Sequence, residues 1–194
     1  MGNVRYSRFV RSDIASDDAE LAQVDMLARQ LLTHLELSSM AINDAHIHGA
    51  SSSAIQRIVS ELLFTELHFR EEVVLTPQSG FVTHSRPDFF YRLASGRGVL
   101  AEVERGGTTT NNHDLKDLWK AHIAEDAHHL FLIVPNANWN ETGAAREHPY
   151  RRVIGRVGAF FGVPRREIDV ESAHVFGYGK GDEDGGELLV LDIE

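Results

Sequence analysis

The feature that most constrains the fold is a run of six apolar residues, LFLIVP, at positions 130–135. A short, uninterrupted apolar run is typical of a strand buried on both faces, because a strand with one wet face alternates apolar and polar residues. Such a strand needs cover on both sides of its sheet, and helices usually supply it. The run therefore favours an α/β protein whose central sheet is flanked by helices.

Helical and extended patterns surround this run. Apolar residues recur at helical spacing over 16–37, 51–69, 112–127 and 150–162. A meander of antiparallel strands is predicted between the second and third of these segments, from the stretches EVVLT, FVTH with FFYRL, and VLAEVER. Two more strands are predicted after the fourth segment, at HVFGY and ELLVLDI. This order predicts an α/β domain with a mixed sheet over 50–194, and an N-terminal helical extension, 1–49, packed on it.

Composition excludes several classes of function. The 194 residues include no cysteine, which removes disulfides, thiolate metal sites and cysteine nucleophiles. The formal net charge of −10 argues against a protein that coats nucleic acid by charge alone, but it allows an enzyme that meets phosphates through bound cations. Neither a secretory signal nor an apolar run of about 18 residues is present, so we expect a cytoplasmic protein without membrane contact.

Three carboxylates are predicted to meet on one hairpin. In VLAEVER, alternation places Leu100, Glu102 and Glu104 on the same face of a strand. A turn centred near Gly96 sets Asp88, on the preceding strand, beside Glu104 and diagonal to Glu102. The alternative is a solvated edge strand whose acidic residues deter aggregation.

Clustered carboxylates repel one another, and a hard divalent cation relieves that repulsion. Mg²⁺ prefers oxygen ligands and combines one or two carboxylates with water and a substrate phosphate, and Mn²⁺ is a second possibility. A site of this kind can orient a phosphodiester and activate the attacking water. The cluster therefore predicts metal-dependent hydrolysis of nucleic acid.

These residues also resemble a known superfamily. Pro87-Asp88, a spacer of 13 residues and Glu102-Val103-Glu104 look like the PD-(D/E)XK motif of restriction-endonuclease-like nucleases, and the order over roughly 50–135 resembles their αβββαβ core. The resemblance implies that Asp88 and Glu102 bind Mg²⁺, together with an acidic residue from the preceding helix. Glu66 is the first choice, because it falls within the apolar face of the predicted helix 51–69, and Glu61 is the second. If that helix ends early, Glu66 instead reaches water.

The sequence departs from the usual motif at its last position, where Glu104 replaces lysine. A subset of type II restriction enzymes looks similar in having Glu-x-Glu, with the second glutamate near the attacking water. Lys116 and Lys120 are alternative sources of the missing lysine. The predicted helical phase, with Trp119 and His122 inward, places Lys120 away from the apolar side and Lys116 at its margin.

Further residues are candidates for contact with nucleic acid. Arg105, Thr110 and Asn111 lie in the loop after the acidic strand, and Arg151 and Arg152 lie on the helix predicted over 150–162. The structural alternatives are a loop capped by Asn112 and a solvated helix face.

The sequence thus predicts a Mg²⁺-dependent endonuclease that hydrolyses DNA in a restriction, defence or repair setting. Because cutting a duplex requires two sites, we expect a homodimer. The main alternative is a catalytically inactive DNA-binding or protein-interaction module of the same fold, and a further one is an unrelated α/β protein with a chance motif.

Overall fold

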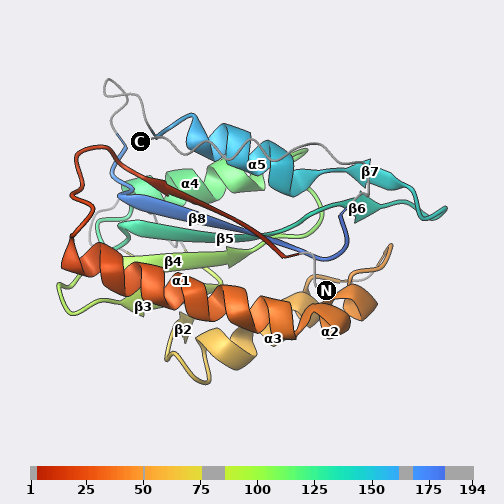
Figure 1. Cartoon of the computed structure of the whole chain (residues 1–194), viewed down its shortest axis with the longest axis horizontal. Helices are drawn as coiled ribbons and strands as arrows, with labels where there is room; N and C mark the ends of the chain where they lie inside the picture. The colour runs from red at the N-terminus through yellow and green to blue at the C-terminus, as the bar shows by residue number, and fades with distance from the viewer. Residues whose placement is uncertain (1–3, 50, 76–85, 162–167, 182–194) are drawn as a thin grey trace.

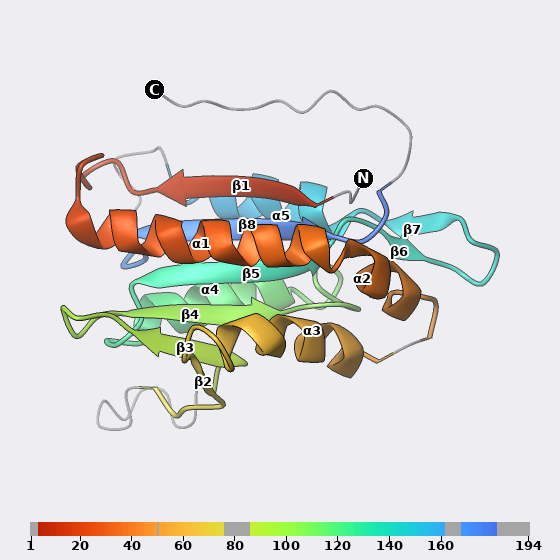
Figure 2. The ribbon, with the colours of Figure 1, turned by 60° about the horizontal axis from the view of Figure 1, so that its bottom comes forward.

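The computed structural model describes residues 4–49, 51–75, 86–161 and 168–181. In this part of the chain six strands form one mixed sheet with helices on both faces, as Figures 1 and 2 show. The predicted α/β class with a mixed central sheet is confirmed. The strands follow the order β1 (Arg5–Val10), β8 (Ser172–Tyr178), β5 (His129–Pro135), β4 (Gly98–Val103), β3 (Phe89–Arg92) and β2 (Arg70–Glu71).

The parallel strands β4, β5 and β8 form the centre of the sheet. Every residue of β5 is buried, which confirms the strand predicted at 130–135. Helix α4 (His113–Ile123) connects β4 to β5, and α5 (Pro149–Gly158) lies between β5 and β8 in the chain. Both helices cover the same face of the sheet, as the preferred hand of parallel crossovers requires (Figure 2).

The opposite face is covered by α1 (Ala19–Leu37), α2 (Ser39–Ala45) and α3 (Ser53–Leu63). Alternation along β4 divides its side chains between two cores. Val99, Ala101 and Val103 pack in the core beneath α1 and α3, whereas Leu100 packs in the core beneath α4 and α5. Glu102 follows Leu100 at a spacing of two, so it faces α4.

The N-terminal segment contributes more than the predicted helical extension. Strand β1, which we did not predict, pairs antiparallel with β8 at the edge of the sheet. Helix α1 then packs on the sheet, and its first turn is capped by Asp18, whose carboxylate accepts from the amide of Leu21 at 2.8 Å. No helix of the described residues is long and apolar enough to cross a membrane.

The predicted meander is partly confirmed. Strand β3 pairs antiparallel with both β2 and β4. The strand predicted at EVVLT is wrong, because β2 occupies Arg70–Glu71 instead. The predicted strands FVTH and ELLVLDI lie outside the described residues. A two-stranded hairpin, β6 (Asn138–Trp139) and β7 (Ala145–Glu147), extends from the end of the sheet where β5 finishes (Figure 1).

The start of β4 gives a test of this packing. A methyl group added to Gly98 would run into the Phe90 ring and lie 2.8 Å from the backbone oxygen of Asp126, whereas Gly155 on α5 has open space. We expect Gly98→Ala to lower the free energy of unfolding by about 1–3 kcal/mol, because the buried ring has to shift.

Gly155→Ala is the matched control and should raise the free energy of unfolding by about 0.5–1 kcal/mol, because alanine favours helix interiors. Denaturant unfolding monitored by circular dichroism measures both. Equal stability of Gly98→Ala and the wild type would contradict this packing of the hairpin.

Candidate functional site

The β3–β4 hairpin brings Asp88 next to Glu102. Phe89 pairs with Ala101, so Asp88 falls opposite Glu102. The amide of Asp88 donates to Glu102 Oε2 at 3.2 Å, and Asp88 Oδ2 accepts from the amide of Val103 at 2.8 Å. Each carboxylate is therefore held by the backbone of the other strand.

This register corrects the predicted one, which placed Asp88 beside Glu104. The amide of Leu93 donates to the oxygen of Arg97, so the turn has three residues and is centred on Ser95 rather than Gly96. Gly96 supplies the positive φ, 89°, that closes such a turn. Moving the centre by one residue shifts the pairing by two, which leaves the same side chains on the same face.

Helix α4 adds a lysine and a third acid to this pair. Lys120 Nζ donates to Glu102 Oε1, and it also donates to Asp117 Oδ1 at 3.2 Å. Glu102 and Asp117 are each only 5% exposed, so these contacts form in the interior. A lysine therefore reaches Glu102 from α4 rather than from β4, where position 104 holds glutamate.

The predicted phase of α4 was wrong. Trp119, predicted inward, is 58% exposed, whereas Asp114 and Asp117 are buried. Asp114 Oδ2 lies 3.4 Å from Arg156 Nε of α5, whereas Lys120 joins Asp117 to Glu102 of β4. Lys116, the other candidate lysine, is exposed. Counting apolar residues could not identify a face whose buried groups are charged.

Glu104 lies just beyond β4, next to the start of α4. Its Oε2 accepts from His113 Nδ1 at 2.8 Å, and its backbone oxygen accepts from the hydroxyl of Tyr178 at 2.9 Å. The side chain is 17% exposed, so solvent reaches this end of the cluster. Both Glu102 and Glu104 contact α4, as their predicted common face requires.

The acidic cluster consists of Asp88, Glu102, Glu104 and Asp117 together with Lys120, and its acids carry more negative charge than the lysine offsets. Burial raises the pKa of Glu102 to about 8, and the charges of Asp117 and Asp88 act in the same direction while Lys120 opposes them. Burial likewise raises the pKa of Asp117, and Glu104 is among the charges that add to this effect. One ammonium thus faces four carboxyl groups, which is the condition that a divalent cation relieves.

One oxygen of this cluster supports such a fit. Asp117 Oδ2 is buried and has no hydrogen-bond partner among the described residues. A buried carboxylate oxygen without a partner is costly, and oxygen ligands are those that Mg²⁺ prefers. The donor set of Asp88, Glu102 and Asp117 is therefore chemically suited to a hard cation.

The acids predicted on the preceding helix do not join this set. Helix α3 ends at Leu63, so Glu66 lies beyond it and is exposed, as is Glu61. The helix to residue 69 that placed Glu66 on an apolar face was wrong, and the alternative of an early end is confirmed. The buried acid beside Glu102 is Asp117, which sequence reasoning missed. Its signal was the charged spacing of Asp114, Asp117 and Lys120, three residues apart on one helical face.

The residues predicted to contact nucleic acid occupy two places. Arg105, Thr110 and Asn111 line a cleft of about 450 Å³ beyond β4. Arg151 and Arg152 are exposed on α5. Asn112 precedes α4, but its side chain does not cap the helix; Asn112 Oδ1 instead accepts from Arg156 Nη2 at 2.6 Å.

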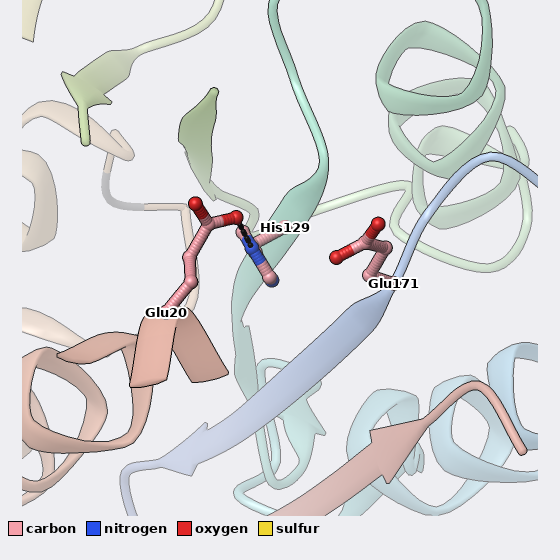
Figure 3. A group of neighbouring side chains, drawn as sticks. All are labelled: Glu20, His129 and Glu171. Atoms are coloured by element: carbon pink, nitrogen blue, oxygen red, sulfur yellow. Dashed lines mark hydrogen bonds and ion pairs between the residues drawn. The ribbon is translucent and has the colours of Figure 1, made fainter. Parts of the chain in front are cut away.

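A second group of ionisable side chains lies at the opposite end of the parallel strands. Figure 3 shows Glu20 from α1, His129 from β5 and Glu171 just before β8. In the described part of the chain, these are the three histidine or acidic residues whose ligand atoms lie within 4.8 Å of one another. Arg97 pairs with both carboxylates, and Arg11 Nη2 lies 3.8 Å from Glu171 Oε1, so two guanidinium groups balance the two carboxylates without a metal.

Ser172 extends this second group. His129 Nε2 donates to Glu20 Oε1 at 3.1 Å, and His129 Nδ1 accepts from Ser172 Oγ at 2.8 Å. The order serine, histidine, acid is that of a hydrolytic triad, but Ser172 is fully buried, so no substrate reaches its oxygen. We therefore interpret these contacts as structural.

No protein-family model matches this sequence, and no curated protein shows significant similarity to it. The function must therefore be inferred from the chemistry of the site itself.

The raised pKa of Glu102 gives a test of the site's electrostatics. At a pH between the ordinary pKa of 4.5 and the raised pKa of about 8, the Glu102 carboxyl keeps its proton in the folded chain but has released it in the unfolded chain. The free energy of unfolding contributed by Glu102 therefore falls as pH rises through this interval. Glu102→Gln removes this dependence, so the variant should gain about 1–3 kcal/mol over the wild type between about pH 5 and pH 8 without metal.

Denaturant unfolding in a chelating buffer at both pH values measures this difference. Glu61→Gln, which removes an exposed carboxylate on α3, is the control and should track the wild type at both. A gap between Glu102→Gln and the wild type that does not change with pH would show that Glu102 is ionised normally.

Proposed function

We propose that this protein is a metal-dependent nuclease that hydrolyses DNA phosphodiester bonds, and that Asp88, Glu102 and Lys120 form the centre of its site. One observation carries the proposal: Glu102 accepts hydrogen bonds from the amide of Asp88 and from Lys120. An acid, a second acid and a lysine are the three groups of the PD-(D/E)XK motif, although the lysine here comes from another element.

The order of elements supports the same proposal. From α3 onward the chain runs α3, β2, β3, β4, α4 and β5, and the sheet places β2, β3, β4 and β5 side by side in that order. An antiparallel meander followed by a helical crossover to a parallel strand is consistent with a restriction-endonuclease-like αβββαβ core. Glu102 stands on β4, Asp88 directly precedes β3 and Asp117 stands on α4, so rigid elements can hold these acids in place.

Asp88 and Glu102 would hold the cation, with Asp117 as a further oxygen ligand. Mg²⁺ or Mn²⁺ bound there supplies positive charge for the scissile phosphate and makes the attacking water more acidic. Asp88 also accepts from the amide of Val103, and this contact fixes the orientation of its carboxylate. Asp88 and Glu102 are therefore oriented by the hairpin before a cation binds, whereas Asp117 would complete the ligand set on binding.

Glu104 and Lys120 take the remaining roles. Glu104 is partly exposed and paired with His113, so its carboxylate can accept the proton of the attacking water, and His113 stabilises the orientation of that base. Lys120 keeps Glu102 in place and adds positive charge beside the phosphate. A homodimer would supply the two sites needed to cut both strands of a duplex.

The role of Lys120 is the most specific part of the proposal. We expect Lys120→Met to lower the rate of plasmid nicking in Mg²⁺ or Mn²⁺ by about 10²-fold or more, because it removes a charged group from the reacting centre. Asp88→Asn should lower the rate similarly and weaken Mg²⁺ binding in a calorimetric titration, while its amide oxygen can still accept from Val103.

Lys116→Met is the matched control, since Lys116 is exposed on the same helix, and it should cut at close to the wild-type rate. Circular dichroism verifies that each variant is folded, because loss of one buried partner can destabilise the chain by about 3–5 kcal/mol. Absence of cleavage by the wild type on any DNA substrate would favour the inactive binding module. Normal cleavage by folded Lys120→Met would remove the lysine from the mechanism.

A further inference from the structure

A cleft of about 450 Å³ lies beyond the carboxyl end of β4. Three segments form its walls: the loop between α2 and α3, the loop that follows β4, and the β6–β7 hairpin. Figures 1 and 2 show α2 and the hairpin at the same end of the sheet. Arg105 lines the cleft and directly follows Glu104, so the cleft begins one residue along the chain from the proposed base.

Hydrogen bonds tie the three walls together. Arg105 Nη2 donates to the backbone oxygen of Ile47, and Asn138 Nδ2 donates to the backbone oxygen of Arg105 at 3.2 Å. His48 Nδ1 donates to the backbone oxygen of Trp139 at 3.1 Å. Because each wall is bonded to another, the cleft is formed before a ligand arrives, which lowers the entropic cost of binding.

The lining of the cleft suits a nucleotide. The lining contains two arginines, Arg105 and Arg146, and one carboxylate, Glu147. The cleft is therefore cationic, although the whole chain carries a net charge of −10. Local positive charge in a negative protein concentrates an anion at that place. Trp139 is half-buried in the same lining and supplies an aromatic surface on which a base can stack.

The size of the cleft limits what it can hold. A volume of about 450 Å³ falls in the range of small-molecule sites and is far too small for a base-paired duplex. Thr110 and Asn111 add hydrogen-bonding groups that can read a base or a sugar.

We propose that this cleft binds one unpaired nucleotide of the substrate strand, with its phosphate on Arg105 and Arg146 and its base on Trp139. The inference rests on the proposed nuclease function for its placement beside the cut. It adds that the enzyme selects DNA containing a single-stranded or unpaired position over a fully paired duplex.

Binding without cleavage tests this directly. The chain has two tryptophans, and Trp119 lies on α4, so in a Trp119→Phe protein the fluorescence reports on Trp139 alone. In a chelating buffer, a single-stranded DNA oligonucleotide should quench this fluorescence. Anisotropy of labelled DNA should show at least about tenfold tighter binding of the single strand, and of a duplex with one unpaired base, than of a blunt duplex.

Trp139→Leu should weaken single-strand binding by about ten- to a hundredfold, the loss of one stacked base. Arg146→Gln alters an exposed side chain, so it keeps the fold and should reduce both the affinity and its salt dependence. Arg29→Gln, an exposed arginine on α1 outside the cleft, is the matched control and should change neither by as much.

The two proposals fail separately. Asp88→Asn should keep single-strand binding while losing cleavage. If the wild type cuts DNA but binds paired and unpaired DNA equally, or if Trp139→Leu and Arg146→Gln bind like the wild type, the cleft assignment is overturned and the nuclease stands. If single-strand binding depends on Trp139 and Arg146 but no DNA is cut, the cleft stands and the nuclease does not.

Discussion

The contact between Lys120 and Glu102 joins the two elements on which the candidate site depends. It fixes α4 over β4, and α4 is the crossover that places β5 parallel to β4. Two charges taken out of water are costly, and well-packed apolar residues often stabilise a core as well or better. The folded chain is therefore less stable with Glu102, Asp117 and Lys120 at the contact between α4 and β4 than with well-packed apolar residues there. A cost of this kind is expected where residues serve chemistry rather than folding.

Carboxylates gather around basic side chains at both ends of the parallel strands, but their charge is balanced differently at the two ends. At the amino end, Arg97 pairs with Glu20 and Glu171, and Arg11 also pairs with Glu171, so two guanidinium groups balance the two carboxylates. At the carboxyl end, Lys120 serves both Glu102 and Asp117, and one oxygen of Asp117 is left without a partner in the described structure. The first arrangement is complete in the protein alone. The second gains from an added cation, which is why we place the chemistry there.

Sequence reasoning reached the strands of this site more reliably than its helix. The apolar run of β5 and the alternation of β4 are local properties. The run predicted the buried central strand, and the alternation placed Glu102 on the face of Leu100. The register failed by two residues because Ser95, not Gly96, is the centre of the turn. Strand β1 was missed because its pairing with β8 joins residues far apart in the chain, which no local pattern encodes.

The helix failed for a different reason. Periodicity assumes that the buried face is apolar, whereas the buried face of α4 includes Asp114 and Asp117. The same assumption assigned Lys120 to the solvent, although its charge is what the acidic strand requires. Buried charged residues are therefore those that the hydrophobic pattern is least able to place.

The position of a bound cation tests the central claim most directly. Crystals grown with Mn²⁺ and measured near the manganese absorption edge would locate the metal by its anomalous scattering. The account predicts a peak between Asp88 and Glu102, within coordinating distance of Asp117, and loss of that peak in Asp88→Asn. A peak only among Glu20, His129 and Glu171, or no ordered metal in the protein, would contradict it.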